Sequence, residues 1–228
     1  MNLMTFLRYD GRAAEASIAP TRANIQKEND HMYVPKVLAF SGSARRESLN
    51  RKLLNIAVQA AIEAGAAVTV LDLNDYPLPI YHGDLEAREG LPGSARKLKQ
   101  LFLEHQGLLI ASPEHNASVS ALLKNTIDWV SRPDGGQNGL VPYQNKVAAL
   151  LAASPGNNGG LRGLPQLRAI MQTLGVLVLP QQYALARAHE AFDAQGRFND
   201  PRAHASVAGI AQRLVETMRA LAPTRQGA

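Results

Sequence analysis

The sequence contains no cysteine and few aromatic residues, and both absences exclude classes of protein. None of its 228 residues is Cys, and only 5% are Phe, Trp or Tyr. Without cysteine there is no disulfide, no thiolate nucleophile, no iron–sulfur cluster and no cysteine-ligated zinc site. With so few aromatic rings, the core must be built mainly from Ala, Val, Leu and Ile, and the composition does not suit a single-stranded nucleic-acid binder.

Long apolar runs and blocks of like charge are also missing. The sequence has no apolar stretch of the roughly 18 residues that a membrane-spanning helix needs, so we expect no membrane insertion. The net charge is +5, but the basic residues are scattered, and we expect no nucleic-acid partner. A chain without cysteine is compatible with a reducing cytosol, and we expect a cytoplasmic protein.

The first part of the chain differs from the rest. Residues 1–34 carry mixed charges and lack both a sustained apolar block and the central apolar region of a secretory signal. We expect an N-terminal extension that is flexible or packs on a partner subunit, with Met32 as an alternative start. One domain is predicted over residues 35–222, followed by a tail at 223–228.

From residue 36 onward, short apolar runs alternate with helical patterns. Strands are predicted at 37–40, 68–71, 108–111, 147–153 and 176–179, and helices at 48–64, 94–105, 120–130, 160–174 and 200 to about 221. Two prolines make residues 76–81 irregular. Apolar strands separated by helices are typical of a parallel sheet covered on both faces. We therefore predict a doubly wound α/β fold, in which ligands bind beyond the carboxyl ends of the strands.

The loop after the first predicted strand, residues 41–50, suits an oxyanion. Ser43 and Ser48 offer hydroxyl groups, Arg45 offers a fork of donors, and the following helix presents its positive end. The loop has neither the lysine of an ATPase phosphate loop nor the dinucleotide fingerprint. The alternative is that Ser48 only caps the helix and that Arg45 is only a surface charge.

The loops after the third and fourth predicted strands are polar as well. Glu114 and His115 could form an acid–base pair, or Glu114, Asn116 and Ser118 could satisfy loop amides and cap the next helix. Residues 154–160 contain three glycines, which allow backbone amides to approach a flat ligand. The alternative for that segment is a flexible surface loop.

The predicted helix at 120–130 carries the only tryptophan of the chain. Lys124 and Asp128 are one turn apart and can pair. Trp129 lies off the apolar side of this helix, so it either fills a second packing surface or belongs to a subunit interface.

Taken together, these loops resemble the NAD(P)H-dependent FMN reductase family, which includes bacterial chromate and quinone reductases and azoreductases. The resemblance covers about residues 36–185 and rests on four motifs in the family's order. They are Gly42-Ser43-Ala44-Arg45-Arg46-Glu47-Ser48-Leu49-Asn50, then Pro113-Glu114-His115-Asn116, then Leu123-Lys124-Asn125-Thr126-Ile127-Asp128-Trp129, then the glycine-rich segment from Ser154 to Gly160.

The resemblance implies a flavodoxin-like sheet of order 2-1-3-4-5 that binds FMN and uses NADPH or NADH as co-substrate. The phosphate of FMN would be held by Ser43, Arg45, Ser48 and Asn50. The ribityl chain and the ring would be lined by Pro113, Glu114, His115 and Asn116. The pyrimidine end of the ring would be approached through the backbone by Ser154, Gly159 and Gly160. No side chain is expected to act as a nucleophile or as a metal ligand.

The resemblance also implies an activity and an assembly. NAD(P)H would pass a hydride to N5 of the flavin, and the flavin would then reduce a flavin, quinone, azo compound or similar acceptor in a ping-pong scheme. The family forms homodimers or homotetramers, with the helix that carries Lys124 and Trp129 near the interface. Tyr81 and Asp84 are expected to reach the neighbouring subunit's site.

One residue departs from the family pattern, and alternatives remain open. The family usually has Tyr where this chain has His115, whose ring is smaller and can carry charge near neutral pH. Nicotinamide preference and acceptor range are therefore open, and an organoarsenical-reducing subgroup also lacks this Tyr. A flavodoxin-type electron carrier is a second hypothesis, although such carriers are typically acidic. A nucleotide-sensing regulatory protein without turnover is a third.

Overall fold

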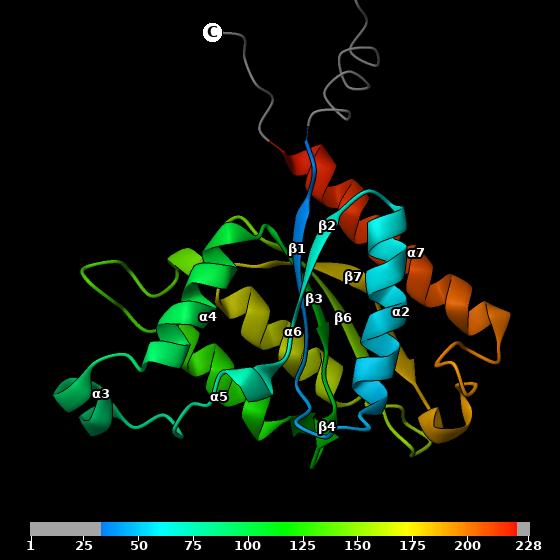
Figure 1. Cartoon of the computed structure of the whole chain (residues 1–228), viewed down its shortest axis with the longest axis horizontal. Coiled ribbons are helices and arrows are strands. Elements are labelled where there is room, and N and C mark those ends of the chain that lie inside the picture. The colour runs from blue at the N-terminus through cyan, green and yellow to red at the C-terminus, as the bar shows by residue number, and fades with distance from the viewer. Residues whose placement is uncertain (1–32, 223–228) are drawn as a thin grey trace, which may run out of the picture. The chain divides into compact units, whose positions relative to one another are not determined.

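The computed structural model describes residues 33–222, which fold around one parallel sheet (Figure 1). The sheet order is β2-β1-β3-β6-β7. The strands are β1 (Lys36–Ser41), β2 (Ala67–Leu71), β3 (Gly107–Ala111), β6 (Val147–Ala153) and β7 (Leu177–Leu185). This is the predicted 2-1-3-4-5 arrangement, so the doubly wound flavodoxin-like fold is confirmed. The predictions for the tail and for almost all of the extension concern residues outside the described range.

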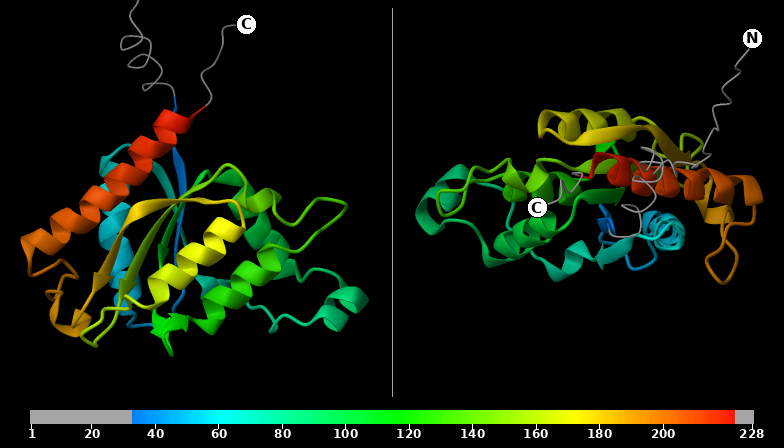
Figure 2. Two further views of the ribbon diagram at one scale, coloured as in Figure 1. Left: turned by 180° about the vertical axis from the view of Figure 1, so that it is seen from behind. Right: turned by 90° about the horizontal axis from the view of Figure 1, so that it is seen from above.

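Helices cover both faces of the sheet (Figures 1 and 2). On one face lie α2 (Leu49–Glu63) and α7 (Pro201–Leu221), and on the other lie α4 (Gly93–Glu104), α5 (Ala121–Val130) and α6 (Gly163–Thr173). All five were predicted from sequence. Three begin at side-chain caps, because Ser48, Ser120 and Asp200 each accept an amide of the first turn. In the described residues no helix is long and apolar enough to cross a membrane.

The interior strand β6 shows why the predicted strands are continuously apolar. All seven of its residues are buried. Val147, Ala149, Leu151 and Ala153 pack with α2 and α7, whereas Ala148, Leu150 and Ala152 pack with the helices of the opposite face. Because successive side chains of a strand point to opposite faces, both sets must be apolar when helices cover both faces.

Strand β7 runs further than predicted. The pattern predicts a strand that ends at residue 179, yet pairing with β6 continues to Leu185. The register shifts on the way: Val178 pairs with Ala148, but Gln182 pairs with Leu150. Pro180 lies in the shifted segment and has no N–H to donate. A proline is tolerated here because β7 is an edge strand with a bulge.

Two features between the predicted elements were missed. A two-stranded hairpin, β4 (Glu114–His115) and β5 (Ser118–Val119), stands at the carboxyl edge of the sheet. A segment from residue 76 to residue 92, called the excursion below, contains α3 (Gly83–Glu89) and extends away from the sheet (Figure 1). No residue of α3 is buried. Short 3-10 helices occur at Leu73–Asp75, Val141–Tyr143 and Ala188–Glu190.

Candidate functional site

A cavity of about 330 Å³ lies at the carboxyl edge of the sheet, where the fold class places ligands. Three loops that are far apart in the sequence meet there, namely those after β1, β3 and β6. Most of the predicted site residues line it: Ser43, Arg45, Ser48, Asn50, Pro113, Glu114, His115 and Ser154. Asn116, Gly159 and Gly160 are not among its lining residues.

The loop after β1 presents unpaired donors to this cavity. In the described part of the chain, the backbone amides of residues 46–50 have no hydrogen-bond acceptor, as expected where α2 begins. The guanidinium of Arg45 is exposed and makes no hydrogen bond or ion pair to any described residue. Unpaired amides at the positive end of a helix, next to a cationic side chain, form an anion site. The donor set therefore fits the phosphate of a ligand.

Glycine is required at the start of this loop. The Gly42 amide donates to Ala111 O at 2.9 Å, which ties the loop to β3. A Cβ added at this position would lie 2.9 Å from Leu123 Cβ. Such a distance is shorter than carbon–carbon contacts allow, so α5 approaches the loop as closely as it does only because residue 42 has no side chain.

The side chain of Asn50 connects the loop after β1 to the end of β6 and so acts as a structural strut. Its Nδ2 donates to Ala153 O at 2.8 Å, and its Oδ1 accepts from Ala153 N at 2.9 Å. The N–H and C=O of Ala153 face the same side as Leu151 O, which accepts from Ser112 N, the last donor of this ladder. The Asn50 amide thus completes the ladder where β3 ends. Sequence reasoning missed this role, because the partner is 103 residues away.

Glu114 is held by donors from the start of α6. Its Oε2 accepts from the amides of Arg162 (2.9 Å) and Gly163 (3.1 Å), and its Oε1 accepts from the Arg162 guanidinium at 2.6 and 2.8 Å. Burial alone would raise the pKa of Glu114, but these bonds outweigh it and lower the pKa. Glu114 does satisfy backbone amides, as the second interpretation of the motif expected, but they belong to α6. The expectation that this motif caps the next helix is wrong, because Ser120 caps α5 and Ser118 donates to Gln166. His115 is exposed at the cavity.

The glycine-rich segment after β6 folds tightly on itself, with the Gly159 amide donating to Gly156 O at 3.3 Å. Gly159 and Gly160 have φ values of 60° and 91° and are buried. A Cβ at Gly159 would lie 2.6 Å from Ala186 N, and one at Gly160 would lie 2.7 Å from Ala152 Cβ. Both positions therefore need glycine for conformation and for space. Their contact with a flavin ring stays a prediction.

Trp129 fills a second packing surface, one of the two alternatives drawn from sequence. It is fully buried, and its Nε1 donates to Pro79 O at 2.7 Å. Asn125 brackets the same stretch, because its Nδ2 donates to Pro79 O at 2.9 Å and its Oδ1 accepts from Tyr81 N at 2.8 Å. The Tyr81 ring packs edge-on against Trp129, with centroids 5.1 Å apart. These contacts anchor the excursion to α5.

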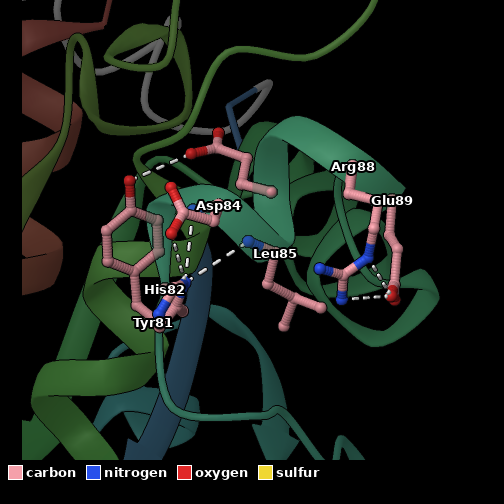
Figure 3. Close-up of polar contacts among 7 residues, drawn as sticks. Tyr81, His82, Asp84, Leu85, Arg88 and Glu89 are labelled. Atoms are coloured by element: carbon pink, nitrogen blue, oxygen red, sulfur yellow. Dashed lines mark hydrogen bonds and ion pairs between the residues drawn. The ribbon is translucent and has the colours of Figure 1, made fainter.

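Local contacts shape the excursion beyond this anchor. Figure 3 shows the ring of His82 capping α3, its Nδ1 accepting the amides of Asp84 (3.2 Å) and Leu85 (3.4 Å). The Tyr81 hydroxyl donates to Glu86, which also pairs with Arg132 at 2.9 Å. On α5 itself, Lys124 and Asp128 pair at 2.8 Å, as the spacing predicts.

A second cavity, of about 600 Å³, lies at the opposite edge of the sheet. It is lined mainly by the first residues of β6 and β7 and by the end of α7, including Val147, Leu177, Met218 and Leu221. Lys146 also lines it, and its Nζ donates to the carbonyl of His105. None of the motif loops reaches this edge, so the site at the carboxyl edge is the candidate for function.

Comparison with known proteins agrees with this geometry. Residues 35–190 match the model of a family described as NADPH-dependent FMN reductase. The chain belongs to this family. An NAD(P)H-dependent FMN reductase of Pseudomonas aeruginosa is 36% identical over 169 residues, which cover 74% of this chain and 86% of that protein. An NADPH:quinone oxidoreductase of Arabidopsis thaliana is 33% identical, covering 72% of this chain and 82% of that protein.

A solved structure extends the similarity to three dimensions. The flavoenzyme NAD(P)H:(acceptor) oxidoreductase FerB of Paracoccus denitrificans superposes with a TM-score of 0.67 at 29% identity, covering 82% of this chain and 98% of that one. The FMN reductase fold thus accounts for nearly the whole described range. In this fold class, ligands bind beyond the carboxyl ends of the strands. This explains why three loops that are far apart in the sequence line one cavity.

Proposed function

We propose that the protein is an FMN-dependent NAD(P)H oxidoreductase that passes two electrons from NAD(P)H, through FMN, to a flavin, quinone, azo compound or similar acceptor. The observation that carries this proposal is the row of unpaired amides at residues 46–50 beside Arg45, in a chain of the FMN reductase family. When bound, FMN supplies the ring that exchanges hydride, and the protein supplies position and electrostatics. The FMN reductase domain is proposed to span residues 35–222.

The phosphate of FMN is proposed to bind the loop after β1. The guanidinium of Arg45 and the amides of residues 46–50 supply donors, and the hydroxyl of Ser43 adds one more. Ser48 can contribute its amide and also its hydroxyl, which accepts from Arg51 N at 3.2 Å and keeps its own proton to donate. Asn50 acts indirectly, by holding this loop to the end of β6.

The flavin ring is proposed to lie between the hairpin and the glycine-rich segment. Pro113, Glu114, His115 and Asn116 would line the ribityl chain and one side of the ring. Ser154 faces the cavity, and the backbone of Gly159 and Gly160 would approach the pyrimidine end. Gly160 N would be the donor there, because Gly159 N already donates to Gly156 O at 3.3 Å. Backbone donors at that end favour negative charge on the reduced ring. No side chain has to act as a nucleophile in this scheme.

His115 is proposed to set the acceptor range. It is exposed and lines the cavity at the place where the family usually has Tyr. An imidazole covers less area beside the ring than a phenol does, which leaves room for a bulkier second substrate. Replacing His115 by Tyr should narrow the acceptors toward those of typical family members. An unchanged acceptor profile in H115Y would contradict this role.

The enzyme is proposed to form a homodimer or homotetramer through α5 and the excursion, and to act in the cytoplasm, where nicotinamide cofactors are available. Support comes from Ile80, which is 85% exposed on a backbone that is hydrogen-bonded on both sides, at Pro79 and Tyr81. A rigidly held, exposed apolar side chain is typical of an interface anchor. Tyr81 and Asp84 would then approach the neighbouring subunit's site.

The assembly is tested by light scattering after size exclusion. Ile80→Asp should lower the mass to that of a smaller oligomer, because a carboxylate cannot be buried unpaired in an interface. Ile62→Asp is the matched control, since Ile62 is also exposed but lies on α2. A variant I80D that keeps the mass of the parent protein would place the interface elsewhere.

The activity is tested on the full chain with added FMN. The expected result is a yellow protein that oxidises NADPH or NADH with acceptors from a panel of free flavin, quinone, azo dye, chromate and organoarsenical. FMN bound without turnover would favour the flavodoxin-type carrier. A protein that does not take up FMN would refute both flavin hypotheses and leave the nucleotide-sensing alternative.

A further inference from the structure

The hairpin that carries His115 cannot hold its own position. Each of its strands has two residues, and the turn residues Asn116 and Ala117 both have positive φ, 51° and 62°. That conformation matches a tight hairpin turn but is unfavourable for alanine. Isolated two-stranded hairpins are marginal even when they are longer. The position of His115 therefore depends on contacts made outside the hairpin.

Those contacts all lead to the first turns of α6. Ser118 Oγ donates to Gln166 Oε1 at 2.5 Å, and Gln166 Nε2 donates to the carbonyl of Ala117. Glu114 accepts the amides of Arg162 and Gly163. A Cβ at Gly163 would lie 3.2 Å from Ser118 O, so the approach between hairpin and helix is close.

Glu114 supplies the side-chain acceptor for the first amides of α6 that the helix's own cap residue does not supply. The residue at the cap position, Arg162, makes no side-chain capping bond, and the acceptor arrives from 48 residues earlier in the chain. The Glu114 side chain is only 8% exposed, whereas that of Arg162 is 62% exposed. The guanidinium bonds Oε1 from a side chain that is mostly exposed to solvent, which screens the pair. The two amides that bond Oε2 are fixed by the backbone of α6, so they are the contact that ties the hairpin to the helix.

We infer that Glu114 is a positioning residue, whose carboxylate fixes the hairpin to α6 and thereby fixes His115 at the mouth of the cavity. The inference rests on the proposed function. Because the phosphate of FMN is held by a different loop, loss of the Glu114 carboxylate should disturb the placement of the nicotinamide and the acceptor more than the binding of FMN. A displacement of about 1 Å costs on the order of a hundredfold in rate.

The test compares three variants that remove different parts of the contact. Arg162→Gln removes the ion pair and keeps both amide bonds. Glu114→Gln keeps one amide-accepting oxygen and loses the charge. Glu114→Ala removes all four bonds. Glu190→Gln is the matched control, because it removes an exposed ion pair, Arg187–Glu190 at 2.6 Å, in a different loop.

Three quantities are measured at a temperature at which every variant is folded: the Kd of FMN, the KM for NAD(P)H and the rate of FMN reduction at saturating NAD(P)H. R162Q and E190Q should match the parent protein. E114Q should lose part of the reduction rate, and E114A about tenfold to a hundredfold, as expected for misplaced reactants. The Kd of FMN should change less than the reduction rate in every variant, since the phosphate donors are untouched.

Other results have distinct meanings. If E114A reduces FMN as fast as the parent protein, Glu114 does not position the site. If R162Q falls as far as E114A, the ion pair rather than the cap fixes the hairpin, and the inference is overturned. Failure of the parent protein itself to bind FMN would refute the proposed function instead, so the two failures can be told apart.

Discussion

Asn50 offers the sharpest separation between a structural role and a ligand-binding role. The motif resemblance assigns it to the phosphate, whereas its amide makes two bonds to the backbone of Ala153, at 2.8 and 2.9 Å. Asn50 is 4% exposed. Replacing it by Ala leaves a buried N–H and a buried C=O of Ala153 without partners.

The expected loss of stability follows from these two unpaired backbone groups. A buried polar group left unpaired costs about 1–3 kcal/mol, and the neighbouring cavity lets water relieve part of it. We therefore expect Asn50→Ala to lower the free energy of unfolding by about 2–4 kcal/mol, out of the roughly 5–15 kcal/mol of a typical domain. For a chain of this size, such a loss lowers Tm by roughly 4–16 °C.

The assay is urea unfolding of the FMN-free protein, followed by far-ultraviolet circular dichroism. Asn55→Ala is the matched control, because Asn55 lies exposed on the same helix. If Asn50 served only as a phosphate ligand, N50A would unfold like the parent protein without FMN and lose stability only when FMN is present. That pattern would refute the strut role.

Three further predictions concern the phosphate donor, the glycine-rich segment and the buried lysine. Arg45→Ala should raise the Kd of FMN about tenfold to a hundredfold, measured by fluorescence quenching, and leave the FMN-free protein equally stable; an unchanged Kd would contradict the anion site. Gly159→Ala should destabilise the fold by about 2–4 kcal/mol in urea, because of its φ of 60° and a Cβ that would meet Ala186 N at 2.6 Å; parent-like stability would show that the segment rearranges freely. Burial lowers the pKa of Lys146 to about 8, so the unfolded state binds more protons above that pH and stability rises with pH. Relative to Lys146→Met, the parent protein should gain about 2 kcal/mol between pH 7 and pH 9.5, and a constant difference would exclude this titration.

The sequence was most informative where local patterns and burial coincide. Ser48, Ser120 and Asp200 predicted helix starts correctly, because a cap bonds within its own first turn. The uncharged run of β6 predicted a strand buried on both faces, and the structure has helices packed on both sides of it. The order of the strands, in contrast, came only from the family resemblance, since neighbouring strands are joined by contacts that no local pattern encodes.

The missed features depend on contacts that are distant in the chain. The bonds of Asn50 to Ala153 span 103 residues, and the cap that Glu114 supplies to α6 spans 48. The strands of the hairpin are too short to show an alternating pattern. Helix α3 buries none of its residues, so it has no apolar periodicity to detect. Motifs could identify such residues as special but could not say what they touch.

The way in which the excursion is attached affects which parts of this enzyme can change in evolution. It is joined to α5 mainly through backbone atoms of Pro79 and Tyr81, bonded by Asn125 and Trp129. Because no residue of α3 is fully buried, substitutions on its solvent-facing side cost the fold little stability, whereas Leu85 and Glu86 contact the rest of the domain. Mutations can therefore accumulate on that side and change what the segment contacts, while the steric and hydrogen-bonding requirements of the cavity, at Gly42 and Asn50 among others, are unaffected. The surface of the excursion can thus change its binding partners without any change in the reaction at the cavity.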